Sequence, residues 1–167
     1  MDERPYGGFF RRLAAFILDQ VLLALLYTVI FLVGAKILGI DLMPLLSFRS
    51  SYGQNDFLPL LLSYYGMTTI LNMTYFTYFH GTTGQTPGKK LFGLKVVLTD
   101  GRPVPPGIAF LRWVGYFVSA IFLYLGYLWV IVDRKKQAWH DKIAGTVVIR
   151  IHRENLAPEV KEEEKIP

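Results

Sequence analysis

The chain has 167 residues, of which 52% are hydrophobic and only 19% are charged, and its formal net charge is +5. The lysines and arginines lie beside long apolar blocks rather than along one helix face, which argues against nucleic acid as a partner. There is no cysteine, so disulfides, thiolate nucleophiles and sulfur ligands for metals are excluded.

The first apolar block covers residues 13–34 and contains three polar side chains, Asp19, Gln20 and Thr28. A helix of about 20 apolar residues crosses the hydrocarbon core of a bilayer. A soluble helix would need a polar face, and this block is apolar all round. The block is too long for a cleaved signal peptide and has no small-residue cleavage site after it. We therefore predict a retained transmembrane helix.

Asp19 is the chemically unusual residue of this block, because a carboxylate deep in a bilayer costs about 2.5 to 3.5 kcal/mol on insertion scales. Arg12 lies two helical turns before it, so both side chains leave the same helix face. Buried ionisable residues of this kind either line an ion pathway or form an ion pair that fixes helix packing. The sequence leaves both uses of Asp19 open.

The second block, residues 57–79, carries no charge and is long enough for a second transmembrane helix. Thr68, Asn72 and Tyr75 recur along it at helical spacing, which predicts a polar stripe that bonds to a neighbouring helix and faces Asp19. Arginines precede the first block, whereas the loop between the two blocks is nearly neutral. The positive-inside bias therefore places the N-terminus in the cytoplasm.

The third block, residues 113–132, is also uncharged, but a single span there would place the basic residues that follow it outside the cell. A re-entrant or shallow helical hairpin over about residues 107–133, bent near residues 119–126, satisfies both hydropathy and charge. We prefer this hairpin and keep the single span as the alternative. Arg112 precedes the block and is the best candidate to reach Asp19 across helices, with Arg12 as the other.

Between the second and third blocks, residues 90–98 are rich in branched side chains and lead into a turn at Asp100 and Gly101. This pattern predicts a cytoplasmic β-hairpin, to which the branched residues of segment 145–152 add another strand. The predicted fold class is an all-α membrane protein with two transmembrane helices, a third hydrophobic segment and a small cytoplasmic hairpin or sheet. Residues 1–153 form one membrane domain, and residues 154–167 form a polar tail.

Three segments together resemble the RDD family of bacterial membrane proteins. They are RLAAFILD at 12–19, GQTPGKK at 84–90 followed by GLKVV, and WHDKIAGTVV at 139–148. The resemblance covers about residues 6–151 and implies that the arginine and two aspartates of the family correspond to Arg12, Asp19 and Asp141, with Asp133 as the alternative for the last. It also implies a role in transport of a ligand, in sodium/proton antiport or in scaffolding of membrane complexes.

Two functions therefore stand. In the first, a homo-oligomer transports a small ligand or ion, with cation/proton antiport as the concrete case and Asp19 as the ionisable site. In the second, the protein is a membrane scaffold or assembly partner, and its arginine–aspartate pairs are structural. Either function gives the same expected site, which consists of Arg12, Asp19, Asn72, Arg112 and Asp141.

No catalytic, cofactor or metal site is expected. The chain lacks a nucleophile elbow and a zinc-protease helix, and the only imidazole next to a carboxylate is that of His140, beside Asp141. We expect a non-enzymatic protein of the bacterial inner membrane, with the lipid bilayer as its partner and both termini in the cytoplasm.

Overall fold

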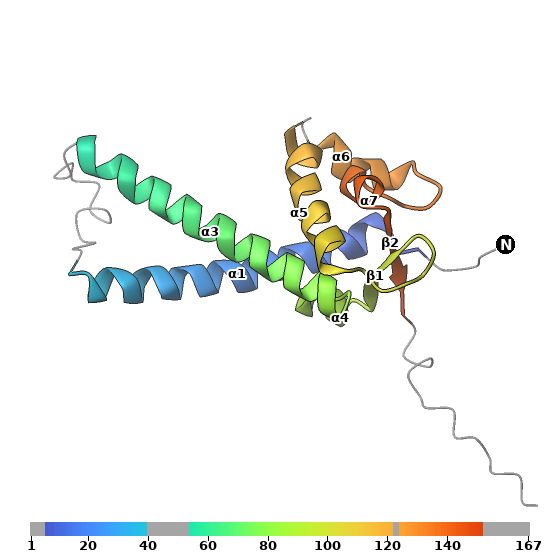
Figure 1. Ribbon diagram of the computed structural model, residues 1–167, viewed down its shortest axis with the longest axis horizontal. Coiled ribbons are helices and arrows are strands. Elements are labelled where there is room, and N and C mark those ends of the chain that lie inside the picture. Colours follow the sequence, from blue (N-terminus) through green and yellow to red (C-terminus); the bar gives the residue numbers. More distant parts are fainter. Residues whose placement is uncertain (1–5, 40–53, 122–123, 152–167) are drawn as a thin grey trace, which may run out of the picture.

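The protein is described by a computed structural model that places residues 6–39, 54–121 and 124–151. Its elements are α1 (Phe9–Ile37), α3 (Gln54–Thr82), α4 (Pro87–Leu91), β1 (Leu94–Leu98), α5 (Pro106–Ile121), α6 (Leu125–Leu128), the 3-10 turn η1 (Trp129–Ile131), α7 (Trp139–Ile143) and β2 (Thr146–Arg150). The long helices α1 and α3 approach each other near α4 and diverge toward their far ends, while the short elements gather at the opposite end (Figure 1). The described chain is therefore mostly helical with one small sheet, as the sequence predicts.

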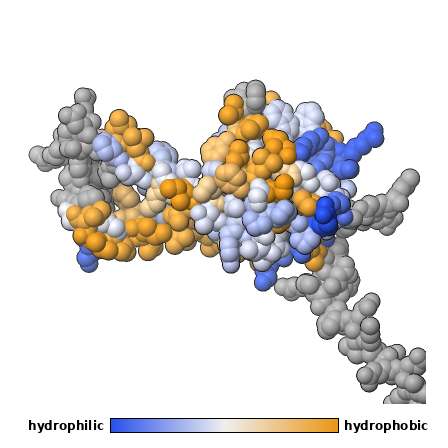
Figure 2. Space-filling view, viewed as in Figure 1, coloured by the Kyte–Doolittle hydropathy of each residue, from blue (hydrophilic) through white to orange (hydrophobic). Residues whose placement is uncertain are grey.

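Within the described residues, α1 is the helix that is long and apolar enough to cross a membrane by itself. Many of its large apolar side chains are exposed, as expected for a helix surrounded by lipid. Hydrophobic residues cover much of the surface of the long helices, and hydrophilic residues gather at the end that holds the sheet (Figure 2). α3 also has 29 residues, but it is less apolar than α1, and the predicted second span is not confirmed.

The third hydrophobic block is broken into two helical pieces. α5 and the segment formed by α6 and η1 are bent by 111° relative to each other, within the range predicted for the bend. At Gly126 an added Cβ would lie 2.6 Å from the Cα of Ser119, so α6 lies directly against α5. Insertion of this bent pair into a membrane stays a prediction.

The sheet has two antiparallel strands, with Leu94 of β1 opposite Arg150 of β2. Tyr6 adds a β-bridge to Ile149, so residues near both ends of the described chain meet at β2. The predicted pairing of segment 145–152 with the first strand is confirmed.

The predicted hairpin across Asp100 and Gly101 is wrong, because the segment after that turn forms no strand in the structure. Pro103 and Pro105 have no N–H group to donate to a strand ladder. The turn itself is present: the amide of Leu98 donates to the carbonyl of Arg102 at 2.9 Å. β2 pairs with the opposite edge of β1, and on the hairpin side the Val96 amide donates to the Gly84 carbonyl at 2.8 Å instead.

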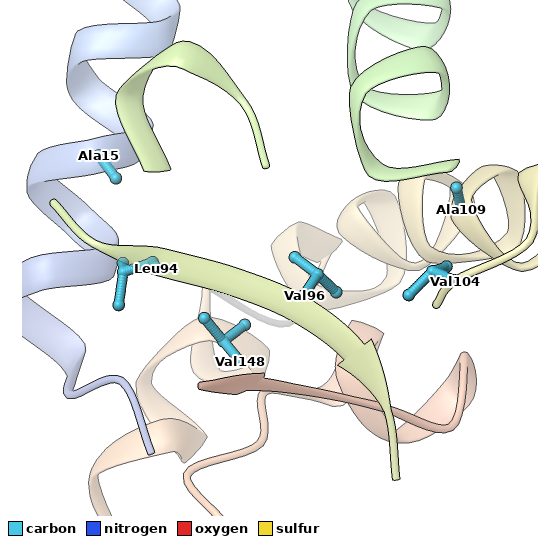
Figure 3. Close-up of a cluster of buried hydrophobic side chains, with 6 residues drawn as sticks. All are labelled: Ala15, Leu94, Val96, Val104, Ala109 and Val148. Atoms are coloured by element: carbon cyan, nitrogen blue, oxygen red, sulfur yellow. The ribbon is translucent and has the colours of Figure 1, made fainter. Parts of the chain in front are cut away.

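A small apolar core lies between the sheet, α1 and α5 (Figure 3). Its members are Ala15, Leu94, Val96, Val104, Ala109 and Val148. A second cluster of buried side chains, Leu23, Tyr27 and Phe76, joins α1 to α3. Burial of a valine, leucine or phenylalanine stabilises a fold by about 1.5 to 3 kcal/mol. These two clusters hold the first half of α1 against the sheet and against α3.

Candidate functional site

Asp19 lies on the buried face of α1 and is completely enclosed. Its carboxylate accepts hydrogen bonds from the Tyr75 hydroxyl at 2.8 Å, the Thr86 hydroxyl at 2.5 Å and the Gly88 amide at 2.8 Å. The donors belong to α3, to the residue before α4 and to α4 itself. We call these four residues the Asp19 cluster, and it connects three separate parts of the chain.

The sequence around Thr86 explains how α4 comes to face Asp19. Thr86 caps the helix by accepting a bond from the Lys89 amide at 3.2 Å, and Pro87 occupies the first turn, where its fixed φ is suitable. The Asp19 carboxylate lies at this N-terminus, where amides lack helical partners and negative charge is favourable. A Cβ on Gly88 would lie 2.2 Å from the Ala15 carbonyl oxygen, so only glycine allows this approach to α1.

Asp141 forms the second buried cluster, together with two arginines. Its Oδ1 lies 2.6 Å from Nη2 of Arg112, and its Oδ2 lies 2.7 Å from Nη1 of Arg12. Oδ2 also accepts from the Ala138 amide at 3.0 Å, as an acid in the first turn of a helix commonly does. Burial alone would raise the pKa of Asp141, but the charges of Arg112 and Arg12 hold that pKa below its usual range. We call Arg12, Arg112 and Asp141 the Asp141 cluster.

The prediction that an arginine pairs with Asp19 is therefore wrong. Nε of Arg12 donates to the Gly7 carbonyl at 2.9 Å, which directs the guanidinium toward the start of α1 and away from Asp19. Arg112 bonds instead to Asp141. The alternative second aspartate, Asp133, lies outside the buried cluster and pairs with a partly exposed lysine.

Asn72 belongs to neither cluster. Its side-chain nitrogen donates to the Tyr27 hydroxyl and to the Thr68 carbonyl, and its oxygen accepts from Gln20 at 3.4 Å. Asn72 therefore connects α3 to α1 by hydrogen bonds, as a polar stripe between membrane helices does. Of the predicted stripe, Tyr75 is the residue that reaches Asp19.

Lys89 was not expected at the site, although the glycine–lysine pair of its motif is visible in the sequence. Its side chain is buried, and its ammonium nitrogen lies 5.8 Å from the centre of the Phe76 ring. Burial, and then the charge of Arg112, lower the pKa of Lys89 to about 7, although Asp19 and Asp141 act in the opposite direction. Lys89 is therefore a buried cation that interacts electrostatically with both clusters and is costly to keep charged.

His140 is the second residue of the site that the sequence does not predict there. Its Nδ1 lies 3.2 Å from the Ser119 hydroxyl, and α5 approaches it so closely that a Cβ on Gly115 would lie 2.9 Å from the His140 Cα. Burial lowers the pKa of His140 to about 3, with Arg112 acting in the same direction and Asp141 against it. His140 is therefore neutral at physiological pH.

A cavity of about 370 Å³ borders the Asp141 cluster and opens between α1, α5 and α6. Its polar wall consists of Arg12, Lys89, Arg112 and His140, and the rest of the wall is aromatic or aliphatic. The wall does not include Asp19. In the part of the chain that the structure describes, no group of three histidine, aspartate or glutamate residues is placed to hold a metal ion.

Comparison with known proteins agrees with these motifs. The profile of the RDD family matches residues 6–145. The "Uncharacterized membrane protein YteJ" of Bacillus subtilis (strain 168) is 31% identical over 147 residues, which are 86% of this chain and 80% of that protein. The "Uncharacterized protein YxaI" of the same strain is 29% identical over 160 residues, 88% of this chain and 98% of that protein. No solved structure matches the chain.

Longer proteins also match in part. The "Proline-rich antigen homolog" of Mycobacterium tuberculosis (strain ATCC 25618 / H37Rv) is 37% identical over 75 residues, and this match covers 44% of the chain and 31% of that protein. The chain thus spans about a third of the length of this mycobacterial relative. The family and the printed name of YteJ both suggest a membrane location. Because the family profile covers most of its length, this chain belongs to the RDD family.

Proposed function

We propose that this RDD protein is a non-enzymatic membrane scaffold, in which both buried clusters are structural. The observation that supports the proposal is the environment of Asp19, which is fully enclosed and accepts three hydrogen bonds. A carboxylate that exchanges protons or cations must be reached by water, and such residues usually face a wet cavity. The cavity wall omits Asp19.

In this proposal the two clusters fix the geometry of the membrane helices. The Asp19 cluster joins α1, α3 and α4, and the Asp141 cluster joins α1, α5 and α7. Both hold the N-terminal half of α1, so the other half extends away with its apolar side chains exposed. α1 and α3 serve as two transmembrane helices, and their diverging faces contact lipid, a second copy of the chain or the helices of a partner.

The test must distinguish the proposed scaffold from the alternative, which is a transporter with cation/proton antiport as the concrete case. Wild type and Asp19→Asn would be purified, reconstituted into liposomes and assayed both for sodium-driven proton flux and for stability. A scaffold predicts flux at the level of empty liposomes for both proteins. It also predicts that Asp19→Asn lowers stability by about 1 to 3 kcal/mol, because charged hydrogen bonds are lost. The matched control, Asp100→Asn, changes an exposed carboxylate outside the clusters and should leave the melting temperature unaltered.

The opposite pattern would overturn the proposal. If wild type exchanges sodium for protons, and Asp19→Asn abolishes the exchange while its melting temperature stays normal, Asp19 is an ion site and the protein is a transporter.

The proposed topology places both termini in the cytoplasm and treats the bent pair of α5 and α6 as a re-entrant hairpin. Single cysteines at the exposed positions Lys90 and Lys135 provide the test, because the chain has no native cysteine. We expect a membrane-impermeant maleimide to label both positions only after the cells are permeabilised. Labelling of Lys135→Cys, but not Lys90→Cys, in intact cells would mean that the third block spans the membrane once.

A further inference from the structure

The buried charges around the cavity do not balance. Arg12, Lys89 and Arg112 contribute three positive charges, whereas Asp19 and Asp141 contribute two negative ones. His140 is neutral and adds nothing at physiological pH. When Lys89 is protonated, one positive charge is therefore left without a counterion among these five residues. Buried charges are normally paired, so an anion bound beside Lys89 would allow this lysine to keep its proton.

Two donors of residues in the cavity wall also lack a hydrogen-bond or ion-pair partner in the described part of the chain, and one of them is fully buried. Nζ of Lys89 makes no ion pair within the described residues, and Nε of Arg112 has no hydrogen-bond partner there although it is fully buried. Nearly all buried donors in folded proteins are bonded, and each exception calls for an explanation. Nζ of Lys89, unlike Nε of Arg112, is not fully enclosed by protein atoms, so an acceptor bound in the cavity can reach it.

The remainder of the cavity suits a hydrocarbon chain rather than a polar solute. Phe16, Tyr127 and Val130 form apolar parts of the wall. Leu13 and Leu128, also in the wall, are 40% and 44% exposed and so lie where the cavity meets the outer surface. The outer surface next to Leu13 is the exposed apolar face of α1, which faces lipid in the proposed topology. The cavity therefore connects buried cations to the region of the acyl chains.

We propose that this cavity binds an anionic amphiphile, whose acidic head group carries one negative charge and whose acyl chain leaves past Leu13 and Leu128. Lys89 and Arg112 contact the head group, and the aromatic wall contacts the first part of the chain. A volume of about 370 Å³ lies within the range of small-molecule sites. Two sources share this chemistry, the phosphodiester of an anionic phospholipid and the carboxylate of a free fatty acid. This site goes beyond the scaffold function, because it requires no protein partner.

Delipidated full-length protein in a nonionic detergent provides the test, with binding measured by native mass spectrometry. The probes are dipalmitoylphosphatidylglycerol, palmitate, dipalmitoylphosphatidylcholine as the uncharged comparison, and glycerophosphoglycerol as a head group without chains. We expect one or both anionic amphiphiles to bind at least about tenfold more tightly than phosphatidylcholine, since one charged hydrogen bond is worth about that factor. The chainless head group should bind more weakly than the phospholipid that carries it. The two anionic probes also identify the source.

Matched substitutions tie the binding to this cavity. Lys89→Met removes the charge at similar length and should abolish the preference for anionic amphiphiles, whereas Lys90→Met changes the adjacent exposed lysine and should leave it intact. Leu13→Trp, which obstructs the rim, should weaken binding, whereas Phe10→Trp, outside the cavity wall, should not. The Leu13 and Phe10 pair decides the question if Lys89→Met does not fold. Equal affinity for anionic and uncharged lipids, or identical behaviour within the matched pairs, would overturn the proposal.

Discussion

Replacement of Asp141 by asparagine is expected to destabilise the protein by about 3 to 5 kcal/mol, because loss of one partner from a buried ion pair leaves the other charge uncompensated. The Asp141 carboxylate is fully buried and bonds to Arg112 at 2.6 Å and to Arg12 at 2.7 Å. Two unit charges about 4 Å apart attract by about 4 kcal/mol at an effective dielectric constant near 20. Arg12 retains 12% exposure of its side chain and regains some hydration in the variant, so the cost stays below the sum of two full pairs.

The measurement is the free energy of unfolding in mixed micelles, obtained by titration with a denaturing detergent. Asp133→Asn is the matched control: its partner Lys142 is 43% exposed, so the change should cost less than about 1 kcal/mol. Asp141→Asn combined with Arg112→Gln should cost clearly less than the sum of the two single changes, since the two side chains act as one unit. Equal costs for Asp141→Asn and Asp133→Asn, or strict additivity in the double variant, would refute the structural role assigned to the Asp141 cluster.

Three further predictions concern the buried residues Gly88, Lys89 and His140. Gly88→Ala should cost about 1 to 3 kcal/mol or more, because its Cβ would lie 2.2 Å from the Ala15 carbonyl oxygen. Gly145→Ala, where φ is +61° and no atom lies within 4 Å, should cost only about 1 to 2 kcal/mol of backbone strain, and equal melting temperatures for the two would contradict the tight contact. In lipid-free protein, stability should rise between pH 7 and pH 10 by up to about 1.4 kcal/mol per pH unit, because the unfolded chain still holds the Lys89 proton that the folded one has lost. Lys89→Met should remove this rise, and an unchanged slope would mean that Lys89 is solvated. His140 is buried neutral, so it should make stability rise from pH 3 to pH 6.5, and His140→Gln should reduce the slope of that part of the profile.

The sequence predicts the long helices well, because long runs of apolar residues with at most one charge have few alternatives to a long helix. α1 begins at Phe9 and ends at Ile37, a few residues outside the predicted block at each end. The bend of the third block is also predictable, since an unbroken span would place the basic residues that follow it outside the cell. These features depend on local hydropathy, which a single sequence contains.

The partners of the charged residues are not predictable in the same way. Helical periodicity places Arg12 and Asp19 on one face of α1, and this is correct, but periodicity does not say which distant segment packs there. Arg12 bonds to a residue 129 positions away, on an element whose position depends on the pairing of β1 with β2. The Thr-Pro sequence at 86 and 87 does predict the start of a helix. The donors of the Asp19 cluster were therefore the residues of the site that the sequence could have predicted.

The contact between Arg12 and Asp141 has a consequence for how the protein is made. Translation at about 5 to 20 residues per second separates the two residues by roughly 6 to 26 s. During that interval α1 exists with Arg12 unpaired, and Asp19 gains its donors only when α3 and α4 have followed. An incomplete chain that ends before α7 therefore presents an unneutralised guanidinium at the start of its first helix.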